Sequence, residues 1–227
     1  MGCTWYLAMT AGEYRGFHGA GAVAWMACHF SADHKGICNL PQSLPPQSLI
    51  LLDDSSPMDG HDPGRVTAQL SDLCRQVKAA GVILDLQRPK TNRAEAMVKV
   101  IVQALNCPVA VTEAYASVTG CPVLVSAPIH LSLEQVVKPW KKREIWLDLP
   151  LGIQTVDPKE VSPVMPPEEG SFPHYDKFRH CQYKTRSTPR GLQFTLCRNK
   201  TMLPGLLERA WKLGITKAVG LYQEYEK

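Results

Sequence analysis

Short apolar runs alternate along this chain with longer stretches in which apolar residues recur every three or four positions. A short apolar run is typical of a strand buried on both faces, and the longer spacing is typical of an amphipathic helix. The predicted strands cover residues 4–9, 48–53, 82–86, 109–113, 122–126, 145–149 and 217–222. The predicted helices cover residues 62–80, 92–105, 133–140 and 201–213.

Strands that alternate with helices in this order predict a parallel sheet covered by helices on both sides. We expect an α/β fold of the (βα)8 TIM-like barrel type, irregular or incomplete in places, as a single domain over residues 1–227. A doubly wound open sheet is the alternative. The chain contains no Gly-x-Gly-x-x-Gly motif or phosphate-binding loop that would favour that alternative.

Local signals predict where the helices begin and end. Asp62, which precedes a proline, is expected to cap the first long helix, and Gly81 to end it. Asn92 and Glu95 have the spacing of a capping box for the next helix. Thr201 is expected to cap the last helix.

Two segments are less regular. Residues 19–30 fit either a helix or a strand. Residues 157–175 contain five prolines and predict a long surface loop. Residues 179–185 and 192–197 predict a hairpin around the turn at 187–191. We therefore expect a proline-rich loop or insertion at about residues 157–190 of the barrel.

The composition is that of an ordinary globular protein, with 44% hydrophobic and 20% charged residues and a formal net charge of +4. Lysines and arginines are scattered rather than gathered in a stripe, so we do not expect nucleic-acid binding. No apolar run approaches the length that crosses a bilayer, and the first residues do not resemble a secretory signal. We expect no membrane partner. The oligomeric state is left open.

The eight cysteines are spread without a Cys-x-x-Cys pair, which favours reduced thiols and a cytoplasmic location. One cluster, formed by Cys28, His29, His34 and Cys38, has residue types that bind zinc. Its spacing matches no common zinc site, and its neighbours are apolar. We expect no metal and no cofactor.

Polar side chains stand where the predicted strands end. In a barrel of this type the carboxyl ends of the strands meet at one mouth, where function is found. The alternative is that these residues only mark where strands leave the core and meet water. The residues in question are Asp53, Asp54, Asp85, Gln87, Glu113, Ser126 and Asp148.

Asp85 is the strongest single candidate for a functional residue. It lies inside an otherwise apolar strand, where a carboxylate is costly unless it has a partner. Ile83, Asp85 and Gln87 are two positions apart, so their side chains leave the same face of the strand. The alternative role for Asp85 is structural, tying neighbouring strands together through hydroxyls or backbone amides.

The segment Ala80-Gly-Val-Ile-Leu-Asp-Leu-Gln87 resembles the signature strand Asp-Gly-x-Asp-x-Asp-x-Glu of family 18 glycoside hydrolases, the chitinase-like barrels. The bacterial spore-coat and germination branch of that family is most similar to residues 81–95. Residues 143–152 resemble a late strand of the family, and residues 191–222 its closing helix and strand. The resemblance covers roughly residues 48–225.

In that family the signature Glu is the general acid, the adjacent Asp orients the substrate's N-acetyl group, and the carbonyl of that group is the nucleophile. The resemblance places Asp85 at the orienting Asp and Gln87 at the acid. Ile83 and Ala80 replace the two outer Asp residues. The family's later Tyr-Asp pair has no match near Ser126. Because an amide has no proton to give, the resemblance implies a degenerate member.

Three functions are compatible with these residues. The first is a barrel that binds a glycan, such as an N-acetylglucosamine oligomer or peptidoglycan fragment, or another ligand or protein, without cleaving it. In that case Asp85 and Gln87 bind sugar polar groups, and Tyr115 and Tyr222 are candidate stacking platforms.

The second is an active glycoside hydrolase with a relocated acid. Glu113 is the first candidate for that acid, with Asp53, Asp54 or Asp148 as its partner. The third is a barrel enzyme of an unrelated class.

Overall fold

The computed structural model describes residues 2–19, 21–166 and 170–226. The chain divides into two compact units. We call the first, Tyr6–Leu124 with Arg143–Trp146, the N-terminal unit. We call the second, residues 2–5, 125–142 and 147–226, the C-terminal unit.

The main sheet is a closed parallel barrel of the (βα)8 type, as the sequence predicts. Its strand order is β1-β13-β8-β7-β6-β5-β4-β2, and a parallel pairing of β1 with β2 closes it. The short strand β3 (Ile37–Cys38) adds to β2 in the antiparallel direction. The barrel strands are β1 (Thr4–Met9), β2 (Ala22–Phe30), β4 (Leu49–Asp53), β5 (Gly81–Asp85), β6 (Val109–Thr112), β7 (Val123–Ser126), β8 (Ile145–Asp148) and β13 (Lys217–Leu221).

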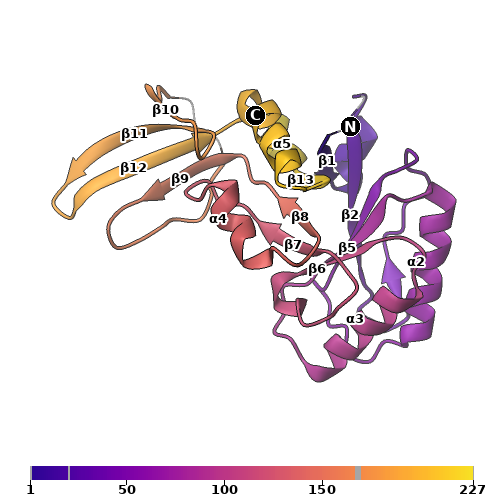
Figure 1. The fold of residues 1–227 in the computed structure, drawn as a ribbon. Coiled ribbons are helices and arrows are strands. Elements are labelled where there is room, and N and C mark those ends of the chain that lie inside the picture. Colours follow the sequence, from indigo (N-terminus) through magenta and orange to yellow (C-terminus); the bar gives the residue numbers. More distant parts are fainter. Residues whose placement is uncertain (1, 20, 167–169, 227) are drawn as a thin grey trace. The chain divides into compact units, whose positions relative to one another are not determined.

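In the N-terminal unit, helices α2 (Pro63–Val77) and α3 (Asn92–Ala104) lie side by side (Figure 1). Their apolar faces bury residues such as Leu70 and Ile101 against the apolar strands β4 and β5. A short helix, α1 (Ala11–Gly16), precedes β2, and a 3-10 turn, η1 (Glu113–Tyr115), follows β6. Because β4 and β5 are buried along most of their length, only their carboxyl ends expose polar side chains.

The C-terminal unit carries a second, antiparallel sheet, which we call the insertion sheet. Its strand order is β10-β11-β12-β9, and β11 and β12 form the long hairpin seen in Figure 1. The strands are β9 (Gly152–Val156), β10 (His174–Asp176), β11 (Cys181–Thr188) and β12 (Gly191–Arg198). The unit's helices are α4 (Leu133–Val137), η2 (Lys138–Trp140), η3 (Lys200–Met202), α5 (Leu203–Lys212) and α6 (Tyr222–Glu226).

The predicted hairpin is confirmed, with a tighter turn than expected. Strand pairing continues to Thr188 and Gly191, which leaves a loop of Pro189 and Arg190. The segment expected to be a loop pairs in part with β9 through bridges at Val161 and Met165. Residues 167–169 of that expected loop lie outside the described residues.

Three helix boundaries differ from the sequence expectation. Helix α2 is capped by Asp62 as predicted, but it ends at Lys78, which adopts the left-handed conformation (φ 48°), and not at Gly81. The Thr91 hydroxyl caps α3 in place of Asn92. The Asn199 side chain accepts the Thr201 N–H at the start of η3, so Thr201 is not the cap. In each case the helix is capped by a residue one to three positions from the predicted one, because the local backbone conformation decides which of the neighbouring residues can cap.

The ambiguous segment at 19–30 forms a strand, β2, over Ala22–Phe30. Among the described residues, no helix is both long enough and apolar enough to cross a membrane.

Candidate functional site

Asp85 and Gln87 lie together at the carboxyl end of β5. Asp85 is the last residue of the strand, and Gln87 is exposed two positions later. The Gln87 amide Nε2 donates a hydrogen bond to Asp85 Oδ1 at 2.5 Å. The side chains leave the same face of the chain, as the period of two predicts. The amide thus interacts with the carboxylate beside it.

Asp54 positions the loop that carries Gln87. Its side chain is 3% exposed, and its Oδ1 and Oδ2 accept the backbone N–H groups of Gln87 (2.8 Å) and Arg88 (3.0 Å). The Arg88 guanidinium donates hydrogen bonds to the backbone carbonyls of Asp54 and Ser55, each at 2.6 Å. A buried carboxylate with two charge-assisted hydrogen bonds is a strong anchor. Both carboxylate oxygens of Asp54 are therefore used in holding the β5 loop against the β4 loop.

A second carboxylate, Asp53, lies beside Asp85 in the parallel register of β4 and β5. Burial raises the pKa of Asp85, the Gln87 hydrogen bond offsets part of this rise, and the nearby charges of Asp53 and Asp54 add smaller increases. A hollow of about 460 Å³ borders this end of the sheet. It is lined by Asp53, Asp54, Ser55, Gln87, Arg88 and Pro89. We call this region the β4–β5 site.

The other two candidates of the N-terminal unit differ from each other in exposure. Glu113 is exposed at the start of η1, one residue after β6 ends. Tyr115 has no exposed surface and belongs to the core, with Lys90 Nζ 5.6 Å from its ring centroid. Its buried ring is therefore not available as a stacking platform, because the short η1 turn directs it inward.

The remaining candidates lie in the C-terminal unit. Asp148 ends β8 and Tyr222 begins α6, and both are half-buried. Glu224, which no sequence pattern marked, also lies here, and its Oε2 accepts the Leu151 N–H at 2.9 Å. Burial raises the pKa of Glu224, and Asp148 raises it further. The sequence offers little to mark Glu224, because residues 222–226 form only one short helical turn after the last strand, too short for a periodic pattern.

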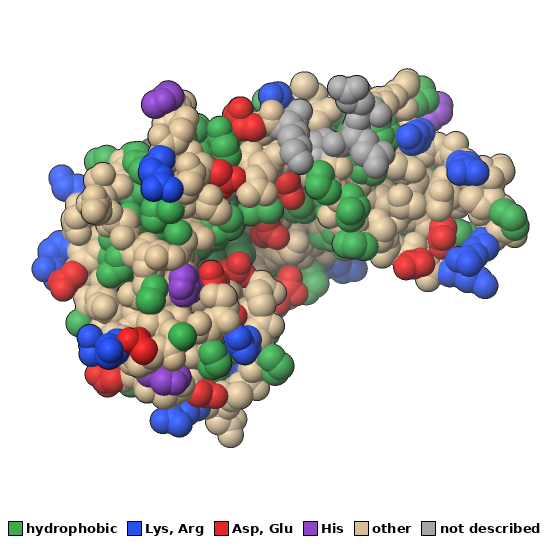
Figure 2. Space-filling view, turned by 180° about the vertical axis from the view of Figure 1, so that it is seen from behind, with side chains coloured by type: hydrophobic (Ala, Val, Ile, Leu, Met, Phe, Trp, Pro, Cys, Tyr) green, Lys and Arg blue, Asp and Glu red, His purple; other side chains and the backbone are tan. Residues whose placement is uncertain are grey.

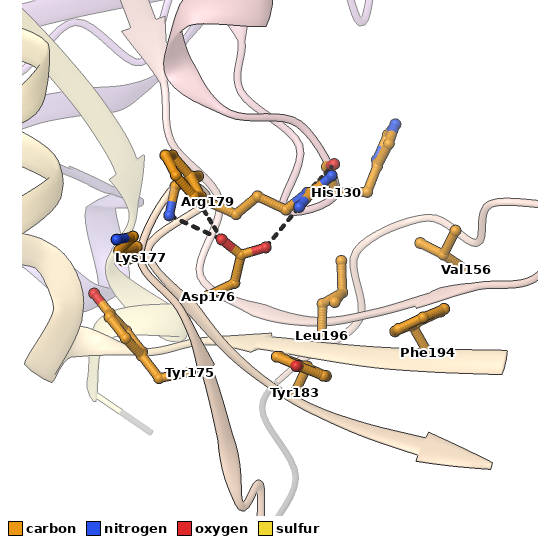
Figure 3. A pocket seen from close by; sticks show the side chains of 10 residues that line it. His130, Val156, Tyr175, Asp176, Lys177, Arg179, Tyr183, Phe194 and Leu196 are labelled. Carbon is orange, nitrogen blue, oxygen red and sulfur yellow. Dashed lines mark hydrogen bonds and ion pairs between the residues drawn. The ribbon is translucent and has the colours of Figure 1, made fainter. Parts of the chain in front are cut away.

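A large concave feature of the C-terminal unit lies on the insertion sheet, and we call it the insertion pocket. It has a volume of about 830 Å³, a size typical of small-molecule sites. Figure 3 shows Tyr183, Phe194, Leu196 and Val156 on one side and the Asp176–Arg179 ion pair opposite them. Phe178, which is 71% exposed, is a further aromatic residue of the lining. No local sequence pattern predicts this pocket, because its lining residues come from separate segments between residues 130 and 196.

Hydrogen bonds fix the polar rim of the insertion pocket. Asp176 accepts from Arg179 at 2.5 Å and from the backbone N–H of Phe178 at 2.8 Å. Burial raises the pKa of Asp176, but these hydrogen bonds outweigh it and hold the pKa below its usual range. Arg179 Nε also donates to the His130 carbonyl at 2.8 Å, which ties the loop after β7 to the pocket.

Two buried polar residues form hydrogen bonds with the loop after β7. Gln154 accepts the His130 N–H at 2.9 Å. Arg198 has no exposed surface and donates to the Ala127 carbonyl at 2.7 Å. Burial lowers the pKa of Arg198 to about 10. The loop after β7 is therefore set by hydrogen bonds from the insertion sheet.

The described residues contain no group of three or more His, Cys, Asp or Glu side chains placed to hold a metal ion. Figure 2 shows lysine and arginine side chains interspersed with acidic ones over the face in view.

Among solved structures, this chain is similar to the spore cortex-lytic enzyme SleL of Bacillus cereus, with a TM-score of 0.60 and 8% identity over 97% of this chain and 71% of that chain. It is similar to SleL of Bacillus megaterium QM B1551, with a TM-score of 0.54 and 8% identity over 98% and 71%. A chitinase of Chromobacterium violaceum ATCC 12472 gives a TM-score of 0.57 and 12% identity over 97% and 95%.

No protein-family model matches the chain, and no curated protein matches it. At these identities the structural likeness concerns the fold and leaves the chemistry open. The barrel shares its fold with chitinase and cortex-lytic barrels.

Proposed function

We propose that this chain is a degenerate family 18-like barrel that binds a glycan containing N-acetylglucosamine at the β4–β5 site without cleaving it. Peptidoglycan fragments and chitooligosaccharides are the two sources of such a glycan. The proposal draws on the fold shared with SleL and chitinase, whose names refer to spore cortex and chitin.

The observation that carries the proposal is the hydrogen bond from the Gln87 amide to Asp85 at 2.5 Å. General acid catalysis requires a group that donates a proton to the leaving oxygen, and an amide does not do so. The same amide is suited to binding: its carbonyl oxygen accepts from a sugar hydroxyl while its N–H groups stay with Asp85. Asp85 accepts from a hydroxyl or an acetamido N–H through its second oxygen.

The insertion pocket supplies aromatic surface that Tyr115 does not. Tyr175 and Phe178 are 55% and 71% exposed, and Tyr183 and Phe194 lie beside them in the lining. Aromatic faces next to hydrogen-bonding groups are suited to sugar rings, which have apolar faces and polar edges. We infer that this pocket is a second binding surface for the same glycan class.

A hydrolase with a relocated acid is the second candidate. Glu113 is exposed directly after β6, the strand paired with β5. Asp85 has a raised pKa, which suits a carboxyl group that holds a proton. In this case the chain would release reducing sugar from chitooligosaccharides, and Glu113→Gln would abolish that activity.

The test is calorimetric titration of the chain with N-acetylglucosamine tetramers and hexamers and, separately, with purified peptidoglycan fragments. Asp85→Ala and Gln87→Ala should each weaken binding about 10- to 100-fold, as expected for losing a hydrogen bond to a charged or well-placed polar group. Gln103→Ala is the matched control, because Gln103 is an exposed amide on α3. Its affinity should equal that of the wild type.

A hydrolysis assay separates the two candidates. The wild type should release no reducing ends, and Gln87→Glu should gain hydrolysis of chitooligosaccharides if the remaining geometry is intact. Hydrolysis by the wild type would favour the relocated acid. Failure of every glycan to bind the wild type would remove both candidates and leave a barrel that binds another ligand or a protein, or an enzyme of an unrelated class.

A further inference from the structure

Two cysteine thiols are in contact on the N-terminal unit, outside the β4–β5 site. Cys74 lies near the end of α2 and Cys107 lies in the turn between α3 and β6. Their sulfur atoms are 3.5 Å apart, although the residues are 33 positions apart in the sequence. A disulfide needs a sulfur separation of about 2 Å, so the two sulfur atoms must approach each other by about 1.5 Å to form one.

Solvent reaches this pair. Both cysteines are half-buried, and they line a hollow of about 330 Å³. Arg75 and Lys78, both exposed, line the same hollow, together with the polar side chains of Gln47 and Asn106. The hollow is thus large enough for a small molecule. Arg75 forms an ion pair with Asp72 at 3.1 Å, so the net positive charge at the hollow comes from Lys78, which attracts an anionic molecule.

The structure assigns the Cys74–Cys107 pair as a dithiol site that closes to a disulfide by exchange with a small anionic disulfide of the glutathione type. The inference does not rest on the proposed glycan function, because none of its residues belongs to the β4–β5 site or to the insertion pocket. It also goes beyond the expectation that the eight cysteines are reduced thiols.

The two thiols are not equivalent. The hydrogen bond with Cys74 lowers the pKa of Cys107, because the neighbouring thiol stabilises the Cys107 thiolate. The same bond, together with burial, raises the pKa of Cys74. Since the thiolate is the attacking species, we expect Cys107 to be the first nucleophile and Cys74 the second.

The disulfide forms in two successive thiol–disulfide exchange steps. The Cys107 thiolate attacks one sulfur of glutathione disulfide, the glutathione S–S bond breaks, and one glutathione leaves as a thiolate. Cys74 then gives up its proton and attacks the Cys107 sulfur, which forms the Cys74–Cys107 bond and releases the second glutathione. The two cysteines lose two electrons, glutathione disulfide gains them, and the two thiol protons end on the two glutathione molecules.

The bond would join the last turn of α2 to the turn that precedes β6, at the amino-terminal edge of the neighbouring strands β5 and β6. Cys74 precedes the turn into β5, and Cys107 precedes β6 by two residues. In barrels of this type that edge contributes to stability and the opposite edge to function. The disulfide should therefore stabilise the fold and leave ligand binding unchanged.

The experiment uses the full chain equilibrated in buffers of reduced and oxidised glutathione, quenched with acid, and followed by peptide mapping and mass spectrometry. The expected product is a cross-linked peptide pair that contains Cys74 and Cys107, lost on treatment with a dithiol reductant. Oxidation should also raise the melting temperature by about 7–15 °C. The bond restricts the unfolded chain by closing a loop, and the size of the shift follows from the length of that loop and the length of the chain.

Single variants separate the two roles. In Cys74→Ser, glutathione should remain attached to Cys107, because the resolving thiol is gone. In Cys107→Ser, Cys74 should react more slowly with glutathione disulfide near neutral pH. Cys38→Ser is the matched control, a partly exposed cysteine outside the pair, and it should form the disulfide as the wild type does.

Several results would overturn the inference. One is a wild-type chain that keeps a stable glutathione adduct and never closes the bond. Others are a cross-link that joins other cysteines, and an oxidised chain with an unchanged melting temperature. Peptide mapping of the wild-type chain needs no variant, so a mutant that folds poorly does not weaken the test.

Discussion

The β4–β5 site and the insertion pocket hold their polar groups in opposite ways. At the β4–β5 site a buried carboxylate, Asp54, anchors two backbone amides, and the Asp85–Gln87 pair is fixed above it. In the insertion pocket the aromatic rings supply the surface, and a single ion pair, Asp176–Arg179, marks the rim. The first region is specified by hydrogen bonds and the second by ring surface. Substitutions should therefore affect both stability and binding at the β4–β5 site, and binding alone at the insertion pocket.

The largest effect is expected for Asp54→Ala. It removes two charge-assisted hydrogen bonds and leaves the amides of Gln87 and Arg88 without their acceptor, which should cost about 3 kcal/mol of unfolding free energy. Urea unfolding measures this loss. Asp54→Asn, which keeps one acceptor oxygen, should lose about half as much. An Asp54→Ala chain as stable as the wild type would contradict the anchoring role.

The insertion pocket should respond to Phe178→Ala with a change in affinity and not in stability. Because Phe178 is 71% exposed, its removal should change the unfolding free energy by less than about 0.5 kcal/mol. Affinity for N-acetylglucosamine hexamer should fall about 3- to 10-fold, as a lost ring contact implies. Leu192→Ala is the control, an exposed apolar residue of the same sheet outside the lining. Equal affinities for the two variants would exclude the pocket from binding.

Asp85→Asn tests the β4–β5 site through the pH dependence of stability. The folded chain raises the pKa of Asp85 above its ordinary value of 3.8, so the carboxyl stabilises the fold when protonated and loses that contribution as pH rises through the folded pKa. The variant removes the ionised group. Its melting temperature should exceed that of the wild type by a few degrees at pH 7, and the difference should vanish below about pH 3.5.

Thermal unfolding at several pH values tests this, with Asp59→Asn, an exposed acid of the same unit, as control. A wild-type chain more stable than Asp85→Asn at pH 7 would mean that the carboxylate has a stabilising partner that outweighs its burial.

The smallest effect is expected for Glu224→Gln in the C-terminal unit. Burial raises the pKa of Glu224, and the Leu151 N–H partly offsets this, so the sign is the same as for Asp85. The variant keeps an acceptor for Leu151. It should be slightly more stable than the wild type at pH 7 and equal to it below about pH 4. Glu226→Gln, on the exposed side of α6, should show no such dependence.

Local rules predicted most of the barrel. The alternation of apolar runs with helical spacing gave the strands around Asp53 and Asp85 and the helices between them, because both periods are visible within a few residues. The period of two also placed Asp85 and Gln87 on one face. Where local rules failed, as at residues 22–30, the burial of β2 along most of its length removed the alternation that marks a strand.

The sequence by itself determined the order of strands and helices and the placement of Asp85 and Gln87 two positions apart at the end of a strand, since both are properties of neighbouring residues. Only the tertiary structure decided that Asp54 holds the Gln87 loop, that Tyr115 is buried, and that Cys74 touches Cys107. The contacts of Asp54 with Gln87 and of Cys74 with Cys107 each join residues that are 33 positions apart in the sequence. They form because neighbouring strands place these segments side by side, and a periodic pattern over a few residues cannot predict them.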